Sequence, residues 1–243
     1  MRSRFDLKAA LLVIFPILAA GAASAFAQAN PDIFVTPVAN APFSAVVNVQ
    51  RTVLQADGRW AAFRTLRMIG RDSMGRIHNE SRMLEPVTSG DTPQLISIHL
   101  YDPATRTSAR LDARRGVYWA SVVNHPPSTV PPQLLASPTA NGLPENQFTR
   151  EEDLGTRNIG GVSAHGIRET QIIPAGNGSE KPIVITDEFW YADELRINLI
   201  VKHSDPRTGT TALTVTQVNR AEPDPSFFEI PADYKPAGQD ANQ

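Results

Sequence analysis

The sequence predicts a mainly β fold, a curved antiparallel sheet shaped as a half-barrel with about 9–11 strands. Short runs of alternating apolar and polar residues recur along most of the chain. Turn sequences separate these runs, among them Asp57-Gly58 and the Asp-Pro-containing stretch Ser204–Gly209. No good amphipathic helix accompanies them. These observations together indicate a meander of antiparallel strands.

The expected strands follow one another with short turns. The first is typical of a half-buried strand, because every second residue from Phe43 to Val49 is apolar. The turn at Asp57-Gly58 then returns the chain as a hairpin. The full set is Phe43–Leu54, Arg59–Ile69, Arg76–Leu84, Leu95–Leu100, Thr107–Leu111, Gly116–Val123, Val162–Ile173, Ile183–Tyr191, Arg196–His203 and Thr210–Asn219.

Residues 1–27 have the pattern of a cleaved signal peptide. A basic start precedes an apolar run, and Ala25-Phe26-Ala27 fits the small-x-small cleavage pattern. Ala23-Ser24-Ala25 is a competing cleavage site. An uncleaved anchor helix is the alternative, although the run is short for a hydrocarbon core of about 30 Å. We therefore expect an exported protein, periplasmic or extracellular, that does not span the membrane after cleavage.

The remaining chain is expected to form one domain with flexible additions. Residues 28–42 have the composition of a tether, residues 43–236 form a single β-rich domain, and residues 237–243 form a disordered tail. Inside the domain, Asn124–Thr149 contains six prolines and only Glu145 as a charge. We expect this loop, or short helices within it, to cover the sheet as a lid.

Composition excludes several kinds of chemistry. The chain has no cysteine, which removes disulfides, thiolate metal sites and a cysteine nucleophile. From Gln28 to Val123 there are 11 Arg, no Lys and 8 acidic residues, a net charge of +3. From Asn124 to Gln243 there are 9 basic and 16 acidic residues, a net charge of −7. This balance disfavours a nucleic-acid partner, and we expect the two halves to meet through complementary charges.

Catalytic and metal-binding motifs are weak. The five histidines, which include His99 and His203, have no metal-ligand spacing, so we expect no metal and no cofactor. Ser163 and His165 share one face of a strand in a near miss to the Gly-x-Ser-x-Gly nucleophile elbow, but His165 replaces the final Gly. We assign no catalytic residue. A hydrolase that uses this pair, or carboxylates near Glu188, is kept as an alternative.

Aromatic residues are the candidates for contact with an apolar ligand. Tyr118 and Trp119 lie on one expected strand, and Phe189, Trp190 and Tyr191 lie on another. Aromatic side chains on a sheet suit an apolar guest, which most binding sites enclose with such groups. We therefore expect these five residues to bind the ligand beneath the lid.

Four other residues are expected to have structural roles. Glu188 lies two residues before Trp190 and shares its face, so if buried it needs a cationic partner such as Arg168 or Arg196. Phe228, Pro231 and Tyr234 belong to a closing run near the end of the chain, which we call the clasp, residues 227–234. We expect the clasp and Trp190 to share one core.

These features resemble the periplasmic lipoprotein-carrier superfamily, which includes lipoprotein carriers and sigma-factor regulators. The resemblance rests on Glu188-x-Trp190, the turn at Asp205-Pro206 and Phe228-x-x-Pro231-x-x-Tyr234. More narrowly, the run Arg71–Arg76 is similar to the Arg-Asp-Ser-x-Gly-Arg run of a group of exported proteins. The resemblance implies an unclosed half-barrel whose concave face holds apolar ligands under a helical lid. In this chain the Pro-rich loop stands in place of that lid.

The sequence favours an exported, non-catalytic protein that binds an apolar or lipidic ligand, or an envelope partner, on a curved sheet. A periplasmic hydrolase is one alternative. A structural envelope protein that binds its neighbours without a ligand is the other.

Overall fold

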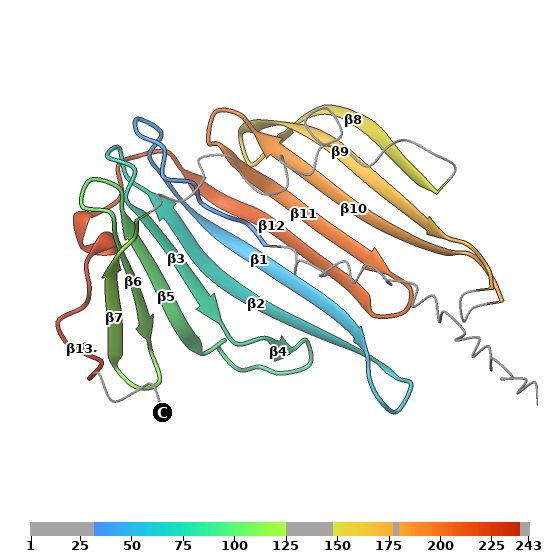
Figure 1. Cartoon of the computed structure of the whole chain (residues 1–243), viewed down its shortest axis with the longest axis horizontal. Helices are drawn as coiled ribbons and strands as arrows, with labels where there is room; N and C mark the ends of the chain where they lie inside the picture. Colours follow the sequence, from blue (N-terminus) through green and yellow to red (C-terminus); the bar gives the residue numbers. More distant parts are fainter. Residues whose placement is uncertain (1–31, 125–147, 177–179, 239–243) are drawn as a thin grey trace, which may run out of the picture. The chain divides into compact units, whose positions relative to one another are not determined.

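Thirteen β-strands form one open sheet in the computed structural model of the protein, which describes residues 32–124, 148–176 and 180–238 (Figure 1). The first seven strands are β1 (Phe43–Leu54), β2 (Trp60–Arg71), β3 (Ile77–Arg82), β4 (Glu85–Pro86), β5 (Leu95–Asp102), β6 (Thr107–Asp112) and β7 (Val117–Val122). The others are β8 (Thr149–Ile159), β9 (Val162–Ile173), β10 (Ile183–Ala192), β11 (Ile197–Asp205), β12 (Gly209–Asn219) and β13 (Lys235–Pro236), which follows the 3-10 helix η1 (Pro225–Phe228).

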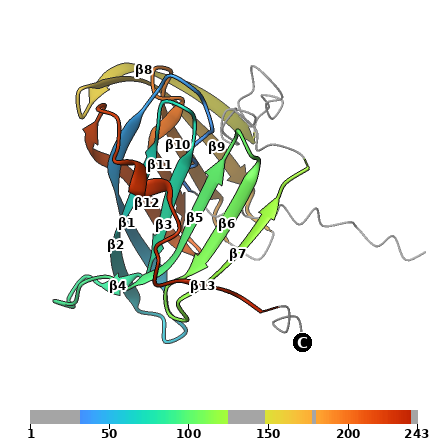
Figure 2. The ribbon, with the colours of Figure 1, turned by 90° about the vertical axis from the view of Figure 1, so that its left-hand side faces the viewer.

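The strands lie in the order β13-β7-β6-β5-β3-β2-β1-β12-β11-β10-β9-β8, with β4 paired to β2. All pairings are antiparallel except that of β13 with β7. An N-terminal half (β1–β7) and a C-terminal half (β8–β12) therefore meet along the ladder between β1 and β12. The predicted fold class, a mainly β protein with a curved open antiparallel sheet, is confirmed (Figures 1 and 2).

Ten of the long strands coincide with the expected ones, and their ends differ by at most two residues. The sequence pattern does not predict β8, whose first residue, Thr149, also ends the expected Pro-rich loop early. Residues 125–147, which make up nearly all of that loop, lie outside the described part of the chain, as do residues 1–31 and 239–243. Among the described residues, no helix is long and apolar enough to cross a membrane.

The two faces of the sheet carry different residues. We call the face that carries Phe43, Val47, Leu213 and Val201 the inner face, because these residues are in register across β1, β12 and β11 or alternate along β1. The opposite face is the outer face. The described part of the expected tether packs on the inner face, where Ile33 and Val35 are buried in the large core.

Arg71 fixes this N-terminal segment to the sheet. Its guanidinium is fully buried and donates hydrogen bonds to the carbonyl oxygens of Thr36 (2.8 Å), Ala41 (2.8 Å) and Leu195 (2.7 Å). Burial lowers the pKa of Arg71 to about 10, which still leaves the group charged at neutral pH. One cation thus ties residues 36–41 and the turn after β10 to the end of β2.

The clasp covers the outer face of the N-terminal half (Figure 2). Phe227 stacks on His78 with ring centroids 3.8 Å apart, and its carbonyl oxygen lies 2.6 Å from His78 Nδ1. Tyr234 and Ile230 pack against a small second core formed by Ile98, Leu100, Ala109 and Leu111. Trp190 belongs to the large core instead. The prediction of one shared core is therefore wrong, because the clasp and Trp190 lie on opposite sides of the β1–β12 ladder.

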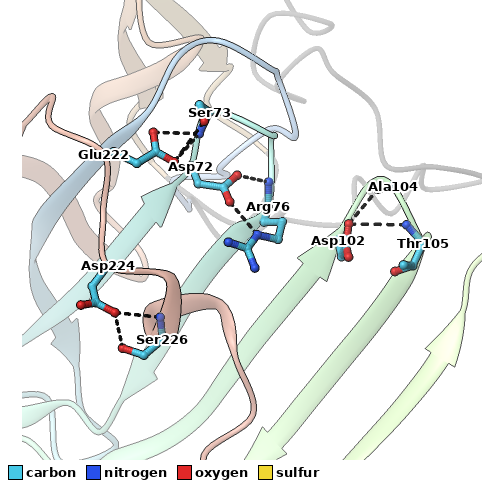
Figure 3. A network of polar contacts seen from close by, with 9 residues as sticks. All are labelled: Asp72, Ser73, Arg76, Asp102, Ala104, Thr105, Glu222, Asp224 and Ser226. Atoms are coloured by element: carbon cyan, nitrogen blue, oxygen red, sulfur yellow. Dashed lines mark hydrogen bonds and ion pairs between the residues drawn. The ribbon is translucent and has the colours of Figure 1, made fainter.

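The chain reaches the clasp through a set of polar contacts at the strand ends (Figure 3). Glu222 accepts hydrogen bonds from the backbone nitrogen (3.0 Å) and the hydroxyl (3.1 Å) of Ser73, in the turn between β2 and β3. That turn is itself closed by Asp72, which binds Arg76 Nε at 2.6 Å. Asp224 then caps η1 by accepting from the backbone nitrogen of Ser226 at 2.8 Å.

The ion pairs of the described residues do not cross between the two halves. Between described residues, each of the twelve ion pairs links partners within the same half. The halves are joined instead by the β1–β12 ladder and by contacts such as Arg71 with Leu195 and Ser73 with Glu222. The expected meeting of the halves through ion pairs is therefore not found among these twelve pairs of the described residues.

Candidate functional site

Four charged side chains form a row across the outer face of β8–β11. The strand register places Glu152 opposite Arg168, Arg168 opposite Glu188, and Glu188 opposite Lys202. Arg168 binds Glu152 at 3.3 Å and Glu188 at 3.0 Å, and Lys202 Nζ binds Glu188 at 2.9 Å. Opposite charges directly across neighbouring strands stabilise a sheet. We call this the outer row, in which every charge faces its opposite.

Glu188 is the centre of the outer row. Its side chain is 12% exposed, and it also accepts a hydrogen bond from Trp190 Nε1 at 2.8 Å. Burial alone raises the pKa of a carboxyl group, but hydrogen bonds from Lys202, Trp190 and Arg168 outweigh burial and hold the pKa of Glu188 at about 2. The predicted contact with Arg168 is present, and the group is an ionised structural anchor.

Trp190 is fixed between a glycine and a cation. Its ring lies flat over Gly166, where an added Cβ would be 2.7 Å from the ring. The guanidinium carbon of Arg157, on β8, lies 3.9 Å from the ring centroid, a distance typical of a cation–π interaction. Trp190 is only 6% exposed, so among the described residues its side chain is a packed core residue.

A second row crosses the same four strands on the inner face, one residue away along each strand. Glu151 lies opposite Glu169, Glu169 opposite Asp187, and Asp187 opposite His203. His203 Nδ1 is 2.8 Å from Asp187 Oδ1. We call this the inner row. Three carboxyl groups thus stand side by side, whereas the outer row alternates in sign.

Glu169, in the middle of the three carboxyl groups, has an unusual protonation equilibrium. Burial raises its pKa to about 7, and the charges of Asp187 and Glu151 add to this effect. Like charges directly opposite on neighbouring strands are unfavourable, so the sheet favours a proton on the central group. Near neutral pH, Glu169 therefore exchanges between a neutral and a charged form.

An apolar band runs beside the inner row. Ile167, Phe189, Val201, Leu213 and Val49 are directly opposite one another across β9, β10, β11, β12 and β1. Val201 and Leu213 are buried, whereas Ile167 and Phe189 are half-buried. The band and the inner row give this face an apolar strip bordered by acidic groups, and we take it as the candidate functional site.

The predicted aromatic ligand residues are distributed over both ends of the sheet. Tyr118 packs on the second core, and its neighbour Trp119, 38% exposed, lies beneath Arg115. Phe189 belongs to the inner apolar band, whereas Trp190 points to the outer face. Tyr191 is half-buried at a bulge in the β10–β11 ladder. β7 lies far from β10 in the strand order, and of the three β10 residues only Phe189 lies in the candidate site.

The structural residues named from the sequence are placed as follows. Glu188 is buried in the outer row. Phe228 is buried in η1, with Arg76 5.1 Å from its ring centroid, and Tyr234 packs on the second core. Pro231 is exposed, and its carbonyl oxygen accepts a hydrogen bond from Tyr234 N at 3.0 Å.

In the structure His165 has an acidic neighbour on another strand, which the spacing of residues in the sequence does not reveal. Asp153, on β8, lies 3.3 Å from His165 Nε2. Both side chains are exposed, at 46% and 71%, and no hydrogen bond links Ser163 to His165 within the described residues. A nucleophile needs its base within hydrogen-bonding distance, so this trio lacks the contact that would make Ser163 reactive.

Histidines and carboxylates do not assemble into a metal site in the described part of the chain. His99 lies on β5 and is 3.0 Å from the Ser108 hydroxyl, while His203 lies on β11 and binds Asp187. Burial lowers the pKa of His99, which favours its neutral form. The two histidines lie near similar turns in the sequence, but four strands lie between β5 and β11 in the sheet.

The inner row is the feature that sequence reasoning missed. Glu169 and Asp187 both lie on expected strands, but their alignment depends on the register of the turn between β9 and β10. Glu151 lies on the unexpected strand β8. The signal that could have found the row is the run Glu151-Glu152-Asp153, since alternation along a strand sends neighbouring charges to opposite faces.

No protein-family model matches the chain. A search of curated proteins likewise finds no match.

Solved structures give weak but consistent likenesses. MucB is 12% identical over 82% of this chain and 60% of its own, with a TM-score of 0.39. The lipoprotein LppX of Mycobacterium tuberculosis is 17% identical over 74% of this chain and 88% of its own, with a TM-score of 0.24. A LolA-superfamily protein from Nitrosomonas europaea is 9% identical over 80% of this chain and 92% of its own, with a TM-score of 0.30.

One of these structures is named as a lipoprotein and another as a LolA-superfamily protein. The chain spans about three fifths of the MucB structure. Because every TM-score is below 0.5, we transfer neither site residues nor function from them.

Proposed function

We propose that this is an exported, non-catalytic binding protein that holds an apolar or lipidic ligand, or an apolar segment of an envelope partner, on the inner face of its sheet. The observation that carries the proposal is the apolar band that runs in register from β9 to β1. Binding faces are mostly apolar, with a few polar groups at defined places. Here the inner row would supply the polar border.

Ile167 and Phe189 are the residues that we assign to ligand contact. Both are half-buried, so they combine an apolar surface with access from solvent. Val201 and Leu213 continue the strip beneath the surface and hold the two contact residues in place. Phe189 is thereby retained from the sequence prediction, and Ile167 is added to it.

The test is binding of an environment-sensitive apolar dye to the mature protein, together with extraction of lipid from a purified sample. Phe189→Ala should weaken dye binding several-fold, because the variant removes accessible apolar surface from one of the two half-buried residues of the band. Leu66→Ala is the matched control, since Leu66 is 49% exposed on β2 and its side chain points to the outer face. It should bind the dye like the wild type.

The outcomes separate the alternatives. An equal loss of dye binding in Phe189→Ala and Leu66→Ala would place the binding site away from the inner face. Absence of dye binding and of extracted lipid in the wild type would favour a structural envelope protein without a ligand. Ester hydrolysis that Ser163→Ala abolishes would favour the hydrolase instead.

A further inference from the structure

The hairpin formed by β8 and β9 ends the sheet, and the inner row crosses it. β8 pairs only with β9 among the described strands, and a register shift between Asp153 and Gly155 interrupts that ladder. Glu169 on β9 faces Glu151 on β8 and Asp187 on β10. Side chains directly opposite one another in such a sheet have Cβ atoms about 4.5–5.5 Å apart. Ionisation of all three groups therefore places three negative charges within close range at the edge of the sheet.

The other charged groups near Glu169 do not neutralise it. On the inner face of β8, Asp153 is the diagonal neighbour, and on β10 the diagonal positions hold Ile185 and Phe189. His203 on β11 lies beyond Asp187 and binds that carboxylate. Arg168, the adjacent residue on β9, points to the outer face, where Glu152 and Glu188 hold it. On the inner face of β8–β10, the charged groups opposite or diagonal to Glu169 are all acidic.

We propose that the β8–β9 hairpin is a pH-responsive edge of the sheet, which is closed while the inner row holds a proton and loosens when that proton is lost. A proton on Glu169 converts a repelling neighbour into a hydrogen-bond donor for a facing carboxylate. β8 is the strand that yields, because releasing it from β9 breaks a single interrupted ladder, whereas β9 and β10 are each flanked by a strand on both sides.

The direction of the response follows from the shift of Glu169. Its pKa in the folded protein, about 7, lies above the ordinary value of 4.5. The stabilising effect of the bound proton is therefore complete below about pH 4.5 and is lost as the pH rises through about 7. The outer row has the opposite shift, since Glu188 is ionised down to a pH of about 2, so it does not respond in this range.

Native-state hydrogen exchange of the whole mature protein, followed by peptide mass spectrometry at pH 5.5 and pH 8, tests the proposal. After correction for the intrinsic exchange rates, protection of β8, residues 149–159, should fall about tenfold relative to the β1–β12 ladder, a change that corresponds to roughly one pKa unit. The expected effect is smaller than the full pKa shift of Glu169, because solvent screens the charges of half-buried groups.

Two variants locate the cause. Glu169→Gln should keep the hairpin protected at pH 8, because a neutral amide replaces the carboxylate that ionises. Glu152→Gln, one residue from the inner row but on the outer face, is the matched control and should show the same fall as the wild type.

Equal protection of the wild type at the two pH values would overturn the proposal, as would the same fall in Glu169→Gln as in the wild type. If Glu169→Gln does not fold, Asp187→Asn gives an independent result. It removes one neighbouring charge and should give a smaller fall, and an unchanged fall would contradict the proposal. None of these measurements depends on a ligand, so the proposal is tested separately from the binding function.

Discussion

Two rows of charge cross the same four strands, one residue apart, and differ in almost every physical respect. The outer row alternates in sign and bonds each neighbour, from Glu152 to Lys202. The inner row places three carboxyl groups in succession and ends at His203. The pKa of Glu188 is held at about 2, whereas that of Glu169 is raised to about 7. The contrast shows that acidic residues on the same strands acquire opposite protonation behaviour through their cross-strand partners.

Removal of the central carboxylate of the outer row, Glu188, should give the largest loss of stability. Glu188→Gln leaves Lys202, Arg168 and Trp190 with a neutral, single-oxygen acceptor. Removing one partner of a buried ion pair typically costs about 3–5 kcal/mol, and the exposure of Lys202 and Arg168 places this case near 3. Urea unfolding at pH 7 measures the loss. The difference from wild type should shrink in acid, because the contribution of an ionised Glu188 is lost as the pH falls from about 4.5 towards 2.

The matched variant on the inner face is Asp187→Asn, which removes a carboxylate from the adjacent residue. It should cost less than about 1 kcal/mol, because an amide oxygen can still accept from His203 and one like-charge contact is relieved. Equal costs for Glu188→Gln and Asp187→Asn would show that the two rows do not differ in the way described.

Gly166→Ala should have the next largest effect. A methyl group at this position would press 2.7 Å from the Trp190 ring, and the ring is held in place by Glu188 and Arg157. Overpacking of this kind typically costs about 1–3 kcal/mol. Gly90→Ala is the control, since no atom lies within 4 Å of its added Cβ and its φ is not in the left-handed region. A thermal melt that shows similar losses for both variants would mean that Trp190 can move aside.

The exposed end of the outer row, the pair of Glu152 and Arg168, should contribute little to the free energy of unfolding. The pair of Glu152 and Arg168 has side chains that are 43% and 38% exposed. Such pairs usually contribute about 0–1 kcal/mol, so Glu152→Gln should change the free energy of unfolding by less than about 0.5 kcal/mol. A loss near that of Glu188→Gln would instead make the outer row a cooperative unit.

Added salt should have the smallest effect of these changes. It should act on the inner row, by shifting the pH at which the β8–β9 hairpin loosens. At 0.5 M NaCl the repulsion among Glu151, Glu169 and Asp187 is screened, which lowers the pKa of Glu169. Burial is the larger cause of its shift, so the pH at which the β8–β9 hairpin loosens should fall by only about half a unit. Hydrogen exchange across pH at two salt concentrations measures this value, and a rise would contradict the like-charge explanation.

The sequence predicts most of the fold because period-two alternation and turn chemistry are local signals. Phe43–Leu54 and Val162–Ile173 are predicted to the residue, and Asp57-Gly58 marks its hairpin. β8 is missed because an edge strand is solvated on both faces, so Glu151-Glu152-Asp153 hides the alternation. The error about the clasp has a different cause, since which face of which strands it covers depends on the path of the chain after β12.

The candidate site is harder to predict than the fold. The contact between Glu188 and Arg168 can be inferred, because a buried carboxylate needs a cation and few are available nearby. The inner row and the apolar band require the register of four ladders, and a shift of one residue would exchange the two faces. The aromatic residues were grouped by type, but the strand order separates Trp119 from Phe189.

Photo-crosslinking with an apolar probe, followed by peptide mapping, tests the proposed binding face most directly. A fatty acid that carries a diazirine can be added to the mature protein at neutral pH and activated by light. We expect labelling of Ile167 and Phe189, with little labelling of Leu66 and Met68 even though these two outer-face residues are more exposed. Labelling concentrated on Leu66 and Met68, or labelling absent from β9 and β10, would contradict the inner face as the binding surface.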